Sequence, residues 1–195
     1  AVQYVGRGAV DGWILNQFSL GEYQDVLRVA TTTGHVWNST SRNHVYCLEL
    51  EEQTLKTIGS IEDLAPGETI YSARFMGERG YLVTYVTIDP LFTLDLSDPS
   101  APEVAGYLKV PVYSDYIHPY GDNHLITLGK DALFVEEEKM AWYQGVQLSI
   151  FDVTDFANPV LLHKELIGDR GTGSEALHNH KAFTFWSAND LLALP

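Results

Sequence analysis

The feature that most limits what this chain can fold into is an internal repeat. Residues 95–102 and 152–159 both read Asp, apolar, hydroxyl, Asp, and both end on a Pro. Each segment completes a run of branched and aromatic residues, and a looser copy of that run lies at 45–50. A strand-like run with its turn, repeated in this way, is typical of a protein that stacks copies of one supersecondary unit.

The repeated units consist of short strands. Val, Ile, Leu, Thr, Tyr and Phe gather in runs such as 81–86, 91–96 and 148–153, and Gly, Pro and Asp separate the runs. These residues suit a pleated sheet and its turns, and no long helical period interrupts them. A unit of four strands and about 42–57 residues has the size of a propeller blade. The sequence therefore predicts an all-β chain, a β-propeller fragment of about four blades with four antiparallel strands each.

We place the blades at residues 13–64, 69–110, 112–169 and 174–195, the last one truncated. The first strand of the first blade is expected at 13–20, and that of the fourth at 174–179. The abrupt ends of the sequence favour a piece of a longer protein. An unclosed ring exposes sheet edges, which would allow a homo-oligomer to form through them.

The third unit carries an extra stretch at residues 129–145. Its aromatic and Met residues predict an extended hairpin or a contact patch for a partner. The run Glu136-Glu137-Glu138 within it is expected to form a solvated loop.

The composition excludes several classes of function. The chain has 12 Lys+Arg against 26 Asp+Glu, a net charge of −14. This balance argues against binding nucleic acid or an anionic membrane, because both need clustered basic residues. No stretch approaches the length of apolar residues that spans a bilayer, so we expect no membrane insertion of this segment. The single Cys47 rules out an internal disulfide and is expected to be a buried, unreactive thiol.

Polar residues on the first strand of each blade are the candidate ligand-binding residues. In a propeller these strands line the central channel, so side chains from different blades would converge at its mouth. The alternative is that they hydrogen-bond between neighbouring blades. The candidates are Gln17, Arg74, Asp115, His118, Glu175, His178 and His180.

Metal binding is the weaker alternative for part of this set. His178 and His180 would share one face of a strand, and with His118 and Glu175 they offer ligands suited to zinc. No Cys-x-x-Cys or His-Glu-x-x-His pattern supports such a site, so we expect no cofactor. The Asp-rich turns at 95–98 and 152–155 would suit calcium, but capping of the turn by the Asp side chain explains them more simply. No nucleophile elbow or triad pattern is present, and no catalytic residue is assigned.

The chain resembles a family of secreted archaeal and bacterial proteins with a C-terminal β-propeller domain distantly related to WD repeats. The motifs that carry the likeness lie at residues 15–19, 22–23, 27–32, 64–75, 89–92, 113–119, 149–155 and 174–183. The resemblance implies a secreted or cell-surface location and no assigned reaction.

We therefore expect a non-catalytic scaffold that binds a protein or a cell-surface glycan. The alternative is a metal-assisted hydrolase, or a lid domain of an attached enzyme, with its site at the channel mouth.

Overall fold

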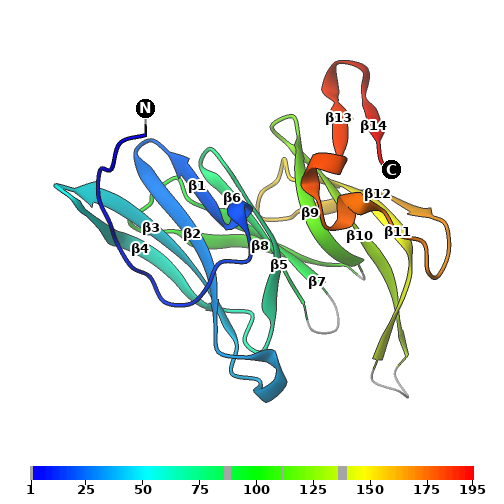
Figure 1. Ribbon diagram of the computed structural model, residues 1–195, viewed down its shortest axis with the longest axis horizontal. Helices are drawn as coiled ribbons and strands as arrows, with labels where there is room; N and C mark the ends of the chain where they lie inside the picture. The colour runs from blue at the N-terminus through cyan, green and yellow to red at the C-terminus, as the bar shows by residue number, and fades with distance from the viewer. Residues whose placement is uncertain (1, 86–88, 111, 136–139) are drawn as a thin grey trace. The chain divides into compact units, whose positions relative to one another are not determined.

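A computed structural model describes residues 2–85, 89–110, 112–135 and 140–195 (Figure 1). The strands in these ranges form three four-stranded antiparallel sheets and one two-stranded sheet. This confirms the prediction of an all-β chain built from four-stranded antiparallel sheets. No helix in the described ranges is long and apolar enough to cross a membrane. The chain divides into two compact units, residues 1–86 with 92–106 and residues 87–91 with 107–195.

The first sheet consists of four strands that follow one another in the sequence and in space. They are β1 (Leu20–Tyr23), β2 (Val26–Thr33), β3 (Arg42–Glu51) and β4 (Thr54–Leu64). Two short 3-10 helices accompany them, η1 (Gln17–Ser19) and η2 (Val36–Asn38). The strand expected at 13–20 is wrong over most of its length, because the Asn16 side chain accepts a hydrogen bond from the Phe18 amide at 2.9 Å and starts η1 instead. Side-chain bonds of this kind compete with a strand ladder.

The second sheet repeats the same order. Its strands are β5 (Thr69–Met76), β6 (Arg79–Tyr85), β7 (Asp89–Asp95) and β8 (Glu103–Val110). Asp98 Oδ1 closes the turn between β7 and β8, because it accepts hydrogen bonds from the amide and the hydroxyl of Ser100 at 2.9 and 2.6 Å. These bonds hold the pKa of Asp98 below its ordinary value. The capping role expected for this turn is confirmed.

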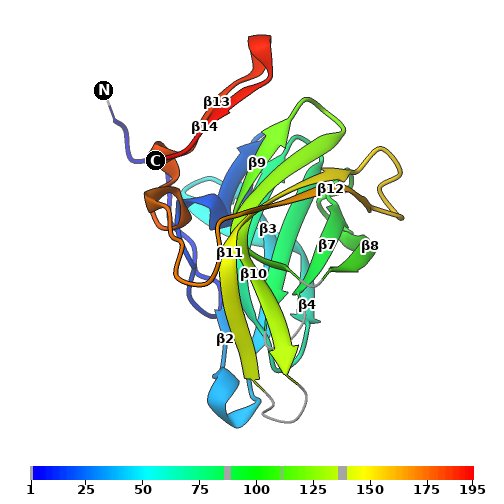
Figure 2. The same ribbon diagram turned by 90° about the vertical axis from the view of Figure 1, so that its right-hand side faces the viewer.

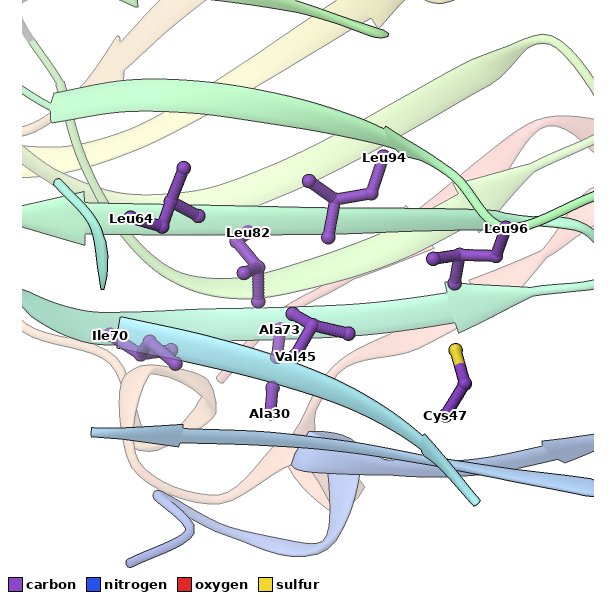
Figure 3. Close-up of a cluster of buried hydrophobic side chains, with 9 residues drawn as sticks. All are labelled: Ala30, Val45, Cys47, Leu64, Ile70, Ala73, Leu82, Leu94 and Leu96. Atoms are coloured by element: carbon purple, nitrogen blue, oxygen red, sulfur yellow. The ribbon is translucent and has the colours of Figure 1, made fainter. Parts of the chain in front are cut away.

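The core of the first unit lies between these two sheets. Ala30, Val45 and Cys47 of the first sheet face Ala73, Leu82 and Leu94 of the second, with Leu64, Ile70 and Leu96 beside them (Figure 3). Alternate residues of β3 supply this contact, as expected for a strand with one face on a core. Cys47 is fully buried, and burial raises the pKa of its thiol. The prediction of a buried thiol is therefore confirmed.

The third sheet belongs to the second unit. Its strands are β9 (Val112–Tyr120), β10 (His124–Val135), β11 (Met140–Asp152) and β12 (Val160–Ile167). β10 and β11 pair as one long hairpin as far as Val135 and Met140, which confirms the expected extension (Figure 2). Glu136-Glu137-Glu138 lies outside the described residues.

The last elements are short. They are η3 (Glu175–Leu177), η4 (His180–Ala182), β13 (Thr184–Trp186), η5 (Ser187–Asn189) and β14 (Leu191–Ala193). β13 and β14 pair as a short hairpin (Figures 1 and 2). The strand expected at 174–179 is wrong. Ser174 Oγ accepts from the Ala176 amide at 3.2 Å and Asn179 Oδ1 from the Lys181 amide at 3.1 Å, so each side chain starts a 3-10 turn.

Candidate functional site

The predicted site residues of the first unit lie where β5 meets η1. Arg74 is half-buried in β5, and its guanidinium carbon lies 4.8 Å from the centre of the Phe18 ring. Gln17 is the first residue of η1 and is exposed. The structure thus places Gln17 next to the residue that Arg74 covers.

Two of the predicted histidines, His118 and His180, share Tyr116 as a neighbour in the second unit. His118 points from the same face of β9 as Tyr116, and the Tyr116 hydroxyl lies 3.2 Å from His118 Nδ1. The centre of the His180 ring, at the start of η4, lies 6.4 Å from the centre of the Tyr116 ring. The sequence therefore identified two residues that share a neighbour although they are far apart along the chain.

The other candidates of this unit have separate surroundings. Asp115 lies at an irregularity in the pairing of β9 with β10. Its neighbours Ser114 and Tyr116 each pair with a residue of β10, and Asp115 is the unpaired residue between them. Glu175 is exposed and accepts a hydrogen bond from Asn179 Nδ2 at 2.8 Å. His178 is exposed and follows the last residue of η3. Across the described ranges, no three His, Cys, Asp or Glu side chains gather closely enough to hold a metal ion.

Aromatic rings surround His118. Its ring centre lies 4.9 Å from that of Phe183 and 5.5 Å from that of Phe185, and Phe185 in turn lies 5.3 Å from Tyr120. Tyr116, His118 and Tyr120 are two residues apart along β9, so the pleat puts all three on one face. We call Tyr116, His118, Tyr120, His180, Phe183 and Phe185 the aromatic cluster.

A pocket of about 290 Å³ opens beside the aromatic cluster. Tyr120, Phe185 and Leu192 form one side of it, and Ile126, Leu148 and Ile150 of the sheet form its apolar floor. Three polar side chains complete the lining: His163, Glu165 and Asp190. An apolar pocket with a few polar groups is the usual form of a binding site for a small group. We call it the aromatic pocket.

A hydrogen bond holds one wall of the aromatic pocket in place. The Tyr120 hydroxyl donates to Asp190 Oδ1 at 3.0 Å, which ties the hairpin β13–β14 to β9. The bond to this carboxylate raises the pKa of the Tyr120 hydroxyl, so the phenol stays protonated and remains a donor. A second cavity, of about 530 Å³, adjoins the aromatic pocket and shares Leu148 and Leu192 with it.

Sequence reasoning missed Tyr120, Phe185 and Asp190. The alternation Tyr116-x-His118-x-Tyr120 is a signal that would have added Tyr120 to the set. Phe185 and Asp190 carry no such signal, because the hairpin β13–β14 meets β9 only through the tertiary fold.

Four-stranded antiparallel sheets in sequence order, with a pocket against a sheet face, define a propeller-type protein with a candidate binding site. The chain belongs to the family described as the beta propeller domain, whose model matches residues 1–195.

The chain is also similar to two uncharacterised archaeal proteins. One, from Methanocaldococcus jannaschii, is 41% identical over 157 residues, which cover 80% of this chain and 23% of the relative. The other, from Archaeoglobus fulgidus, is 35% identical over 190 residues, 97% of this chain and 27% of the relative. The chain thus spans about a quarter of the length of the curated relatives it matches.

Proposed function

We propose that this propeller domain is a non-catalytic scaffold of a secreted or cell-surface protein, and that it binds a protein or glycan partner through the aromatic pocket. The observation that carries the proposal is the combination of the Tyr120 and Phe185 rings with three polar side chains around one small cavity. Aromatic rings give a ligand a large contact area at little cost in conformational entropy. The polar groups His163, Glu165 and Asp190 would then orient the hydroxyl or amide groups of the ligand.

The charge of the chain favours the same kind of partner. With a net charge of −14, the surface repels polyanions and accepts neutral or basic ligands. A sugar chain or an uncharged peptide loop meets this condition, and it also fits a pocket that takes one ring-sized group at a time.

The test is binding of the purified chain to an oligosaccharide array and to a displayed peptide library. We expect selective binding of one class, and a loss of at least about tenfold in affinity in Phe185→Ala. Trp186→Ala is the matched control, because Trp186 is the next residue of β13, is 58% exposed and is not part of the pocket lining. Equal loss in both variants, or chemical conversion of the bound probe, would contradict the proposal.

A further inference from the structure

The connection between β2 and β3 carries a sequence motif that the proposed function does not use. Asn38-Ser39-Thr40 is the chain's single Asn-x-Ser/Thr sequence in which x is not Pro. This sequence is the acceptor motif for N-linked glycosylation, and in a secreted protein such an acceptor belongs to a surface loop. Because the motif is short, its surroundings must also be suited to an attached sugar.

The loop presents Asn38 at the surface in a closed conformation. Residues 35–40 are all exposed. The Ser39 amide donates to Val36 O at 3.0 Å and ends η2. The His35 amide donates to Thr40 Oγ1 at 3.0 Å, and the Thr40 amide donates to His35 O at 3.1 Å. The motif therefore lies on an exposed turn, where an attached sugar would displace none of the strand pairing.

The hydrogen bonds of Asn38 leave its amide nitrogen available. Oδ1 accepts from the Thr40 hydroxyl at 2.6 Å and from the Thr40 amide at 3.2 Å. Among the described residues, none accepts a hydrogen bond from Asn38 Nδ2. The two bonds hold the side-chain amide by its oxygen, so the nitrogen that would carry a sugar is the free end of the group.

Exposed aromatic rings lie beside this motif and give a second, independent observation. The His35 ring stacks on those of Trp13 and Trp37, with 5.9 and 5.8 Å between the centres and angles of 28° and 22° between the planes. Trp37, the residue before Asn38, is 82% exposed, and Trp13 is 49% exposed. We call Trp13, His35 and Trp37 the tryptophan stack.

The tryptophan stack is the kind of surface that an attached sugar would cover. Indole rings exposed side by side mark a contact surface rather than an ordinary solvated loop. The C–H face of a sugar ring packs against the flat face of an indole, and its hydroxyl groups stay in water. A glycan on Asn38 starts one residue from Trp37, so it can make this contact without a change in the loop.

We propose that Asn38 is an acceptor of N-linked glycosylation and that the attached glycan packs over the tryptophan stack. In the transfer, Asn38 Nδ2 forms a bond to C1 of the first sugar of a lipid-diphosphate-linked oligosaccharide. The bond from C1 to the diphosphate oxygen breaks, the lipid diphosphate leaves with the electron pair, and one Nδ2 proton passes to a base of the transferase. This inference rests on the exported location in the proposed function, but its site lies in the other unit from the aromatic pocket.

The test is expression of the chain behind a secretion signal in an archaeal host that N-glycosylates its surface proteins, followed by mass spectrometry of the exported protein. Trypsin cleavage after Arg28 and Arg42 releases the peptide 29–42, which contains Asn38. We expect this peptide to gain the mass of at least one sugar in the wild type and to lack it in Asn38→Gln. Asn158 is exposed but precedes Pro159, so it is an internal control that should stay unmodified.

Variants of the motif show whether the acceptor role depends on the hydroxyl group. Thr40→Ala removes the hydroxyl that the motif requires and should abolish the modification, whereas Thr40→Ser keeps a hydroxyl and should retain it. Ser39→Gly is the matched control, because the middle position accepts Gly and the φ of +57° at Ser39 suits it. It should be modified like the wild type, and thermal melts check that each variant is folded.

Contact of the glycan with the tryptophan stack is measured by NMR of the indole N–H signals in the wild type and in Asn38→Gln. We expect the glycan to shift the signals of Trp13 and Trp37 more than those of Trp142 and Trp186, which belong to the other unit.

Three results would overturn the inference. They are an exported wild type that is unmodified at Asn38, equal modification of Thr40→Ala and Thr40→Ser, and an indole signal of Trp37 that is the same with and without the glycan. None of these results concerns ligand binding at the aromatic pocket, so failure of this inference and failure of the proposed function are distinguishable.

Discussion

Arg28 shows how one residue joins two sheets in the first unit. Arg28 is buried, with only 3% of its surface exposed. Nε donates to Gly21 O at 3.2 Å and Nη1 to Gly77 O at 2.8 Å, so one guanidinium links β1 to the turn between β5 and β6. The rings of Tyr23 and Phe75 lie 5.7 and 5.5 Å from its central carbon. A planar guanidinium that donates to two carbonyls and contacts two rings is an arrangement that Lys cannot copy.

Replacement of Arg28 should therefore lower the free energy of unfolding. Arg28→Lys keeps the charge but loses the contact of a planar guanidinium with both rings and one of the two carbonyl contacts. We expect the free energy of unfolding to fall by about 2–3 kcal/mol, measured by urea denaturation. Arg7→Lys, at an exposed position, should change it by less than about 0.5 kcal/mol. Equal effects of the two changes would refute a clamping role for Arg28.

Single residues also explain what could be predicted from the sequence. Asp98 and Asp155 occupy equivalent positions of the repeat, and each caps its turn. Asp155 Oδ1 accepts a hydrogen bond from the Ala157 amide at 3.2 Å, as Asp98 Oδ1 does from the Ser100 amide. Such local bonds are visible in a sequence because both partners lie within a few residues. Asn16 and Ser174 make equally local bonds, but theirs start 3-10 turns where the division into blades had predicted first strands.

At the scale of elements, small residues set how closely the first two sheets approach. Gly59 of β4 lies against the turn between β7 and β8, and a Cβ there would be 2.4 Å from Pro99 O and 2.7 Å from Pro102 Cδ. A backbone carbonyl and a proline ring cannot move aside as a flexible side chain can. An added Cβ would therefore push β4 away from the turn between β7 and β8.

Gly59→Ala should therefore destabilise the first unit. We expect a loss of about 2 kcal/mol in the free energy of unfolding from overpacking, measured by thermal or urea denaturation. Gly173→Ala is the control, because an added Cβ at Gly173 meets nothing within 4 Å. If Gly59→Ala unfolds like Gly173→Ala, the close approach of β4 to this turn does not contribute to stability.

At the scale of the whole molecule, the sequence could predict the fold class but only part of the site. Periodic strands and repeated turns are local patterns, and the four-stranded sheets follow from them. The aromatic pocket depends on Phe185 and Asp190 meeting β9, which lies some 65–70 positions earlier along the chain. No local pattern encodes such a contact, so the prediction reached His118 and His180 and missed their neighbours.

We propose that this propeller domain binds a partner at the aromatic pocket without converting it. The most direct test is methyl NMR of the Ile- and Leu-labelled chain, titrated with the tightest ligand from the array or peptide library. We expect shifts centred on Ile126, Leu148, Ile150 and Leu192, with the ligand signals broadened but otherwise unchanged. Shifts that leave these methyl groups unaffected, or new signals from a cleaved ligand, would contradict it.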